Sequence, residues 1–100
     1  MTAPDIKERV DAHIKNDKVY AATKSYCPHC KATKKLFEDL NIEYEYEDLD
    51  LIPEGPAIQA YLLELTGQRT VPNIFIKGQH IGGNSDLQAL HKEGKLLALL

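Results

Sequence analysis

The chain has few cysteines and no long apolar run. Its 100 residues include two cysteines, one methionine and no tryptophan. Two cysteines are too few for a disulfide-dense miniprotein. No apolar run approaches the ~20 residues of a membrane helix, and residues 1–10 are charged and lack the apolar segment of a signal peptide. The chain is therefore expected to have no membrane partner and to stay in a reducing cytoplasm.

The chain also lacks an excess of positive charge. Fifteen acidic residues face twelve basic ones, for a formal net charge of −3. Without a basic stripe, a nucleic-acid partner is not expected. The hydrophobic fraction of 43% and the charged fraction of 27% are typical of a soluble globular protein. The length fits one domain over residues 1–100, and no repeat or linker interrupts it.

Hydrophobic periodicity predicts the order helix–strand–helix–strand–helix–strand–strand–helix. Helices are predicted over residues 4–16, 28–40, 57–65 and 84–100, the last interrupted at Gly94. Strands are predicted over residues 18–23, 42–47, 73–77 and 79–81. The first strand, helix and second strand form a right-handed parallel crossover, and the last two strands form an antiparallel hairpin. The predicted fold class is therefore α/β, a small mixed four-stranded sheet with helices on both faces.

Both cysteines lie in the segment Cys27-Pro28-His29-Cys30, where a predicted strand meets a predicted helix. Pro28 suits the first helical position, so Cys27 becomes the N-cap and its sulfur faces the unpaired N–H groups of the first turn. These groups, with Lys24 upstream, favour the thiolate and predict Cys27 as the nucleophile. Lys24, Pro28 and His29 are expected to tune the pKa of the nucleophile. Cys30, one turn on, is expected to point inward and to keep a higher pKa.

The cysteine pair has two other interpretations, a zinc half-site and a pair of structural thiols. Zinc needs two more ligands. The candidates are the four histidines, but no two of them have the close spacing of a second pair of zinc ligands. They are His13, His29, His80 and His91. Pro28 at the helix start, directly after a buried strand, argues against inert buried thiols. No metal site is therefore expected, and a redox motif is favoured.

Three segments together resemble the dithiol glutaredoxins of the thioredoxin-like superfamily. They are Lys24-Ser25-Tyr26-Cys27-Pro28-His29-Cys30, Gln68-Arg69-Thr70-Val71-Pro72-Asn73 and Gly82-Gly83-Asn84-Ser85-Asp86-Leu87. The resemblance extends from about Val19 to the end of the chain. It implies a thioredoxin-like fold and a glutathione-dependent oxidoreductase that reduces protein–glutathione mixed disulfides and protein disulfides. The catalytic residues would be Cys27 and Cys30.

The resemblance also implies a glutathione site, with glutathione as co-substrate and no tightly bound cofactor. The implied glutathione-binding residues are Lys24, Tyr26, Gln59, Arg69, Thr70, Val71, Pro72, Gly83, Ser85 and Asp86. In this family pattern a cis-proline loop pairs with the peptide backbone of glutathione. The start of the last helix takes its γ-glutamyl end, and Lys24, Gln59 and Arg69 take its glycine carboxylate. Taken singly, these residues also have structural interpretations. Gly82 and Gly83 could form only a strand-to-helix turn, and Ser85 or Asp86 could be only a helix cap.

The implied partners are proteins with glutathionylated or disulfide-bonded cysteines. Electrons would be supplied through glutathione reductase and NADPH, and a monomer is expected.

His29 departs from the tyrosine usual in the family. An imidazolium beside the thiolate would stabilise the reduced form. It would move the reduction potential away from the glutaredoxin range, which is about −200 to −230 mV, and toward the value of about −120 mV of a disulfide-introducing oxidase. A net disulfide-forming oxidase therefore stays open as an alternative function. The resemblance leaves a second alternative open, a carrier of an iron–sulfur cluster held by the nucleophilic cysteine and glutathione.

The remaining polar and aromatic residues are expected to be structural. Tyr44 and Tyr46 are predicted to pack on the sheet, and residues 43–50 are predicted to form a solvated acidic edge. The histidines outside the cysteine motif, which are His13, His80 and His91, are predicted to lie on the surface.

Overall fold

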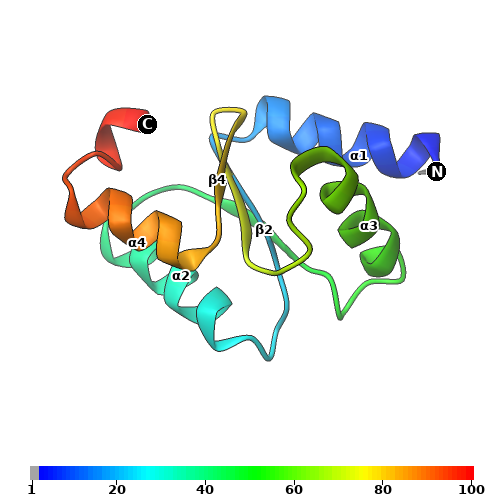
Figure 1. The fold of residues 1–100 in the computed structure, drawn as a ribbon, viewed down its shortest axis with the longest axis horizontal. Helices are drawn as coiled ribbons and strands as arrows, with labels where there is room; N and C mark the ends of the chain where they lie inside the picture. Colours follow the sequence, from blue (N-terminus) through cyan, green and yellow to red (C-terminus); the bar gives the residue numbers. More distant parts are fainter. Residues whose placement is uncertain (1–2) are drawn as a thin grey trace.

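The structure is a computed structural model that describes residues 3–100, so Met1 and Thr2 lie outside the described residues (Figure 1). The helices of this part are α1 (Pro4–Asn16), α2 (Pro28–Asp39), α3 (Gly55–Thr66) and α4 (Asn84–Lys92), followed by a short 3-10 helix, η1 (Leu97–Leu99). The strands are β1 (Val19–Thr23), β2 (Glu45–Asp48), β3 (Asn73–Ile76) and β4 (Gln79–Gly82). None of the helices described is long and apolar enough to cross a membrane.

The strands form one mixed sheet in the order β2-β1-β3-β4. β1 pairs with β2 in parallel, and β3 and β4 form an antiparallel hairpin, so the predicted crossover and hairpin are confirmed. The antiparallel pairing of β1 with β3 joins these two units, and the periodicity of the sequence did not specify it. The carboxyl end of β1 therefore lies beside the amino end of β3. This arrangement sets the segment after β1 next to the segment before β3.

Each face of the sheet is covered by a helix pair, as the sequence predicted. Alternate residues of β1 point to opposite faces. Val19 and Ala21 belong to one core cluster, on which α2 and α4 pack through residues such as Phe37 and Leu87. The intervening residues of the strand face a second cluster, to which α1 contributes Val10 and α3 contributes Ile58 and Leu62. Figure 1 shows the two helix pairs on opposite sides of the strands.

Three element boundaries differ by two or more residues from those predicted from the sequence, and the others agree to within one residue. β2 begins at Glu45 rather than residue 42, because the Ile42 backbone N–H donates to the Phe37 carbonyl oxygen at the end of α2 (N···O 2.8 Å). The third helix begins earlier than predicted, at Gly55, with Pro56 in its first turn. The last helix ends at Lys92 and a separate 3-10 turn follows the predicted interruption at Gly94.

The predicted solvated acidic edge is wrong for Glu47. The Tyr20 hydroxyl donates to its Oε1 (2.7 Å), Arg9 pairs with its Oε2, and its side chain is only 11% exposed. The surface assignment of His13 is also wrong, because its ring stacks on Tyr20 with the ring centroids 4.8 Å apart and is half-buried. Both findings have one cause: α1 packs on this part of the sheet, so it covers Glu47 and turns its own His13 toward Tyr20 on β1.

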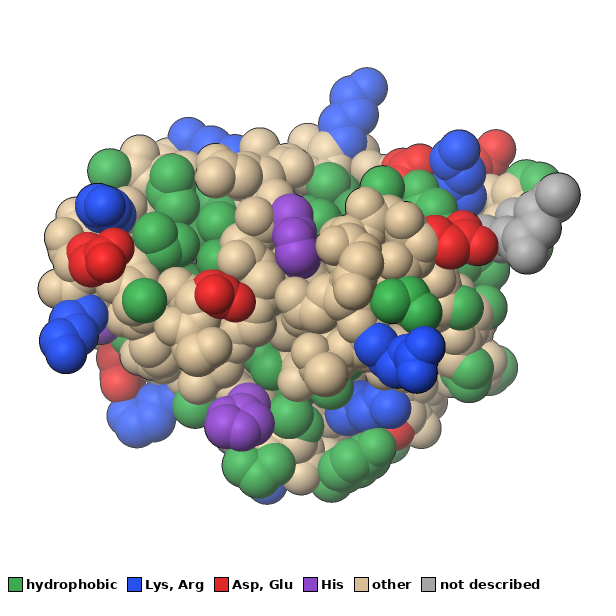
Figure 2. Space-filling view, in the orientation of Figure 1, with side chains coloured by type: hydrophobic (Ala, Val, Ile, Leu, Met, Phe, Trp, Pro, Cys, Tyr) green, Lys and Arg blue, Asp and Glu red, His purple; other side chains and the backbone are tan. Residues whose placement is uncertain are grey.

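Asp48 also departs from the predicted acidic edge. It accepts from the buried Thr23 hydroxyl (2.6 Å) and pairs with the Lys34 ammonium (3.1 Å), which lies 3.9 Å from the centroid of the Tyr46 ring. On the rest of the surface in view (Figure 2), side chains of both charge signs occur. Figure 2 shows acidic and basic side chains interspersed over the face in view, with no stripe of one sign.

We expect Glu47→Gln to destabilise the fold in a pH-dependent way. Burial by itself raises the pKa of Glu47, but the hydrogen bonds from Tyr20 and Arg9 outweigh it, so the pKa is lowered. A carboxyl with a lowered pKa stabilises the fold above its unfolded pKa of about 4.3, and this contribution is lost as the pH falls through the folded pKa. The loss at neutral pH should be about 1–2 kcal/mol, because Arg9 is partly exposed.

Urea unfolding of wild type and Glu47→Gln, measured from neutral pH downward, tests this expectation. The difference in free energy of unfolding should be largest at neutral pH and should shrink in acid. Glu43→Gln, which changes an exposed carboxyl just before β2, is the matched control and should have little effect. A loss for Glu47→Gln that is independent of pH would contradict the ion-pair explanation.

Candidate functional site

Cys27 lies between β1 and α2 and caps the helix as predicted. Pro28 occupies the first turn of α2, and the Cys27 Sγ accepts a hydrogen bond from the Cys30 backbone N–H (N···S 3.2 Å). As a thiol, Cys27 also donates to the Val71 carbonyl oxygen (S···O 3.8 Å). The residue is half-buried. The positive end of a helix and a donor N–H both stabilise negative charge on a sulfur at this position.

Cys30 is the hidden member of the pair. It is completely buried in the first turn of α2, and both cysteines are free thiols. Burial, followed by its hydrogen bond with Cys27, raises the pKa of the Cys30 thiol. The predicted inward orientation and higher pKa of Cys30 are confirmed. The two sulfurs therefore differ in access and surroundings: Cys27 is half-buried and accepts a helix N–H, whereas Cys30 is completely buried and its pKa is raised.

A loop before β3 lies against the open sulfur. The Val71–Pro72 peptide bond is cis, as the resemblance implied. Thr70 is exposed, Val71 half-buried and Pro72 buried. The Gln59 side-chain amide donates to the Arg69 carbonyl oxygen (2.8 Å). Gln59 therefore supports this loop, and its predicted contact with a ligand carboxylate stays a prediction.

The start of α4 forms the third part of the site. Gly83 is the N-cap, and its backbone N–H donates to the Asp86 Oδ2 (2.9 Å). Gly82 has φ +116°, which strains any other residue, and a Cβ there would lie 2.3 Å from the same carboxylate oxygen and displace it from the cap. Asp86 thus caps the helix, and its side chain and that of Ser85 remain exposed. An exposed carboxylate beside free helical N–H groups can receive both charges of an amino-acid head group.

Two contacts fix the site within the fold, one between α2 and α4 and one between the segment before Cys27 and the loop after β2, and the motifs alone revealed neither. The buried Thr33 hydroxyl, one turn after Cys30, donates to the Asn84 Oδ1 (3.0 Å) and so ties α2 to the start of α4. The Ser25 backbone N–H donates to the Asp50 Oδ1 (2.8 Å), and the Ser25 hydroxyl pairs with the same carboxylate. The sequence signals for them were weak: Thr33 is a polar residue on the apolar face of a helix, and Asp50 is an acidic residue in a loop.

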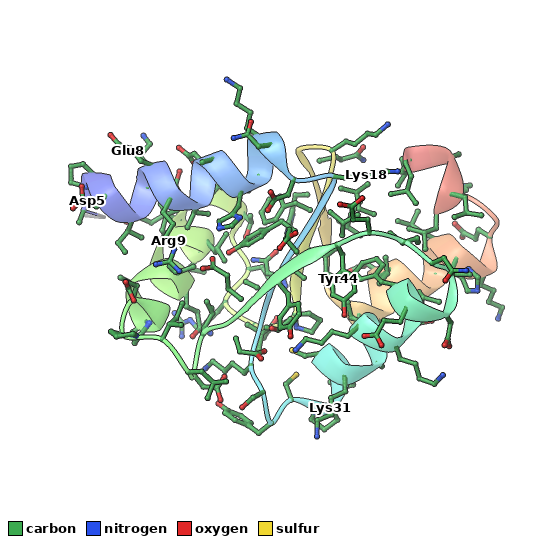
Figure 3. The ribbon with its side chains drawn as sticks, turned by 180° about the vertical axis from the view of Figure 1, so that it is seen from behind. Asp5, Glu8, Arg9, Lys18, Lys31 and Tyr44 are labelled. Carbon is green, nitrogen blue, oxygen red and sulfur yellow. The ribbon has the colours of Figure 1, made fainter. Side chains whose placement is uncertain are left out.

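The other predicted residues differ in exposure. Lys24 is half-buried, whereas Tyr26 is 67% exposed. His29 and Arg69 are also exposed, His29 in the first turn of α2. Figure 3 shows the sulfur atoms beside the start of α2, which the labelled Lys31 marks. The site thus gathers the end of β1, the loop before β3 and the end of β4 at one end of the sheet.

An open and a buried thiol at a helix start, facing a cis-proline loop on a mixed four-stranded sheet, define a thioredoxin-like thiol–disulfide oxidoreductase. The family model of the glutaredoxins matches residues 19–81. The chain belongs to the glutaredoxin family, whose members are glutathione-dependent thiol oxidoreductases. The predicted family, fold and activity class are confirmed.

Individual relatives agree with this assignment. The chain is 48% identical to Glutaredoxin-1 of Rhizophagus irregularis over 95 residues, which cover 95% of this chain and 94% of that protein. It is 52% identical to Glutaredoxin-C6 of Oryza sativa over 82 residues, which cover 82% of this chain and 73% of that protein. Its structure matches that of a buckwheat glutaredoxin–glutathione complex with a TM-score of 0.93 and 40% identity, over 100% of this chain and 94% of that one.

Alkylation should distinguish the two thiols. A limiting amount of iodoacetamide at neutral pH should modify Cys27 well before Cys30, because Cys30 is buried and its pKa is raised. Peptide mapping by mass spectrometry gives the rate at each position. In urea both thiols should react at similar rates, which is the control. Faster modification of Cys30 in the folded protein would contradict the geometry.

Proposed function

We propose that this chain reduces protein–glutathione mixed disulfides and protein disulfides, with Cys27 as the nucleophile and Cys30 as the resolving thiol. The observation that carries the proposal is the inequality of the sulfurs. The Cys27 Sγ caps α2 and is accessible, whereas Cys30 is completely buried one turn on. Lys24, Pro28 and His29 adjoin the nucleophile in the sequence and are the residues proposed to tune it.

A glutathionylated protein needs only Cys27. The Cys27 thiolate attacks the glutathione sulfur of the mixed disulfide, an S–S bond to glutathione forms, and the protein sulfur leaves as a thiolate that takes up a proton. A second glutathione thiolate then attacks the glutathione sulfur bound to Cys27. This step releases oxidised glutathione and restores the Cys27 thiolate. A thiolate supported by a helix start is a good leaving group in this second step.

A protein disulfide needs both cysteines. Cys27 attacks one sulfur of the substrate and forms a mixed disulfide, and the other substrate sulfur leaves. Cys30 then loses its proton and attacks the Cys27 sulfur, which releases the reduced protein and leaves an internal Cys27–Cys30 disulfide. Two glutathione molecules reduce that disulfide and are oxidised to one glutathione disulfide. The i, i+3 spacing on one helix face supports this closure.

We propose that glutathione lies across the three segments around the open sulfur. Backbone groups of Val71 would pair with it as with an added strand, with Thr70 and Pro72 beside them. Gly83, Ser85 and Asp86 would hold its γ-glutamyl head group at the start of α4. Its glycine carboxylate would lie toward the cationic side of the site. The residues proposed for that side are Lys24, Gln59 and Arg69, and Tyr26 is proposed to pack beside the active site.

We propose that the protein works in the cytoplasm. A reductase that draws on glutathione works where the glutathione pool is kept reduced, which supports a cytoplasmic location. Glutathione reductase with NADPH would return the oxidised glutathione to its thiol form. The protein would act as a monomer without a tightly bound cofactor, on partner proteins that carry glutathionylated or disulfide-bonded cysteines.

Substitution of each cysteine should separate the two reactions. Cys27→Ser should abolish both, because a hydroxyl is neither nucleophile nor leaving group at neutral pH. Cys30→Ser should abolish reduction of protein disulfides but keep or raise deglutathionylation, because no internal disulfide can divert the Cys27–glutathione intermediate. Assays on a glutathionylated peptide and on a disulfide-containing protein measure the two activities. Loss of deglutathionylation in Cys30→Ser would show that the roles of the cysteines are assigned wrongly.

Asp86→Ala should weaken the use of glutathione. The apparent KM for glutathione should rise about tenfold, which corresponds to one charge-assisted hydrogen bond of about 1.4 kcal/mol. Because Asp86 also caps α4, Asp86→Asn is the matched control: it keeps an oxygen for the cap and loses the charge. Steady-state kinetics with varied glutathione should give a raised KM for both variants. An unchanged KM would exclude Asp86 from the glutathione site.

A further inference from the structure

Gln68 lies in the loop between α3 and β3 and is half-buried. Its Nε2 donates to the Thr70 carbonyl oxygen (3.1 Å) and to the Pro72 carbonyl oxygen (3.0 Å). A side-chain amide nitrogen carries two hydrogens, so both can be used on these carbonyls. The two accepting residues stand on either side of Val71. One side chain therefore bridges the backbone around the residue that faces the nucleophile.

The bridging residue is itself anchored to the end of α3. Its backbone N–H donates to the Thr66 Oγ1 (3.0 Å), and that hydroxyl donates to the Leu62 carbonyl oxygen inside the helix (2.7 Å). Gly67 ends the helix in the left-handed conformation, with φ +78°. The Gln68 backbone is therefore fixed relative to α3, which limits the positions that its side-chain amide can take.

The residue at the other end of the loop, Asn73, contacts the same Thr66 hydroxyl. The Asn73 Nδ2 donates to the Thr66 Oγ1 (3.4 Å), and Asn73 is only 1% exposed. Its Oδ1 lies 2.8 Å from the His80 Nε2 on β4. Because the Asn73 amide nitrogen faces the hydroxyl, its oxygen is left to accept from the histidine. A continuous polar chain thus runs from the end of α3, around the loop, to the β3–β4 hairpin.

We infer that Gln68 is a positioning residue for glutathione, because its amide fixes the Val71 backbone against the Cys27 sulfur before the ligand arrives. The Val71 carbonyl oxygen lies 3.8 Å from that sulfur, and the carbonyls on both sides of Val71 are held by Gln68. A loop that is already ordered loses less conformational entropy when it binds a peptide. The inference rests on the proposed function, in which the Val71 backbone pairs with glutathione.

Three substitutions separate hydrogen-bond donation from shape. Gln68→Ala removes the bridge. Gln68→Glu keeps the shape but places a carboxylate, which only accepts, against two carbonyl oxygens. Gln68→Lys restores donors on a chain of similar length. Gln79→Ala changes an exposed glutamine on β4 and is the matched control.

The ranking of the variants tests the inference. For Gln68→Ala the apparent KM for glutathione should rise about threefold to tenfold, with kcat within about twofold, as expected for loss of two hydrogen bonds to a binding loop. Gln68→Glu should be impaired at least as much, while Gln68→Lys and Gln79→Ala should stay close to wild type. A glutamate variant that behaves like wild type, or a lysine variant as weak as the alanine one, overturns the donor role.

A binding experiment separates failure of this inference from failure of the proposed function. S-methylglutathione, which has no free thiol, is titrated into the 15N-labelled reduced protein while the Val71 amide signal is followed. If that signal does not respond in wild type, the proposed glutathione site is wrong, and the inference fails with it. If it responds in wild type and Gln68→Ala binds with the same Kd, the inference alone is wrong. The expected result is a response in wild type and a weaker Kd in Gln68→Ala.

Discussion

The hydrogen bond from the Cys30 backbone N–H to the Cys27 Sγ is the contact on which the redox site depends. It exists because Pro28 starts α2 directly after Cys27, so the sulfur takes the place of a capping oxygen. The same geometry turns Cys30 into the core, where burial keeps its thiol protonated. One helix start therefore places two thiols of different exposure within a four-residue segment.

The sheet makes this helix start useful by bringing distant segments to it. The β1–β3 pairing places the Val71 carbonyl beside the Cys27 sulfur, although the two residues are 44 positions apart. The Thr33–Asn84 hydrogen bond then fixes α4 relative to α2. Binding groups and reacting sulfur are thus carried by elements that pack on one core, which limits their relative movement.

Local features of the sequence predicted what is local in the structure. The N-cap at Cys27 follows from a cysteine before a proline at a strand–helix junction, and the first helix has the predicted bounds of Pro4–Asn16. Long-range contacts set the features that were missed. Glu47 has the alternating pattern of an exposed strand face, and only the packing of α1 across the sheet buries it. The bridge from Gln68 likewise depends on how the loop folds back.

The most direct test of the account is a crystal structure of Cys30→Ser trapped as the mixed disulfide of Cys27 with glutathione. The three segments should then meet on one ligand. The expected structure has the peptide backbone of glutathione paired with Val71 and its γ-glutamyl head group at the start of α4, beside Ser85 and Asp86. Glutathione attached to Cys27 but directed away from Val71 and α4 would contradict the account.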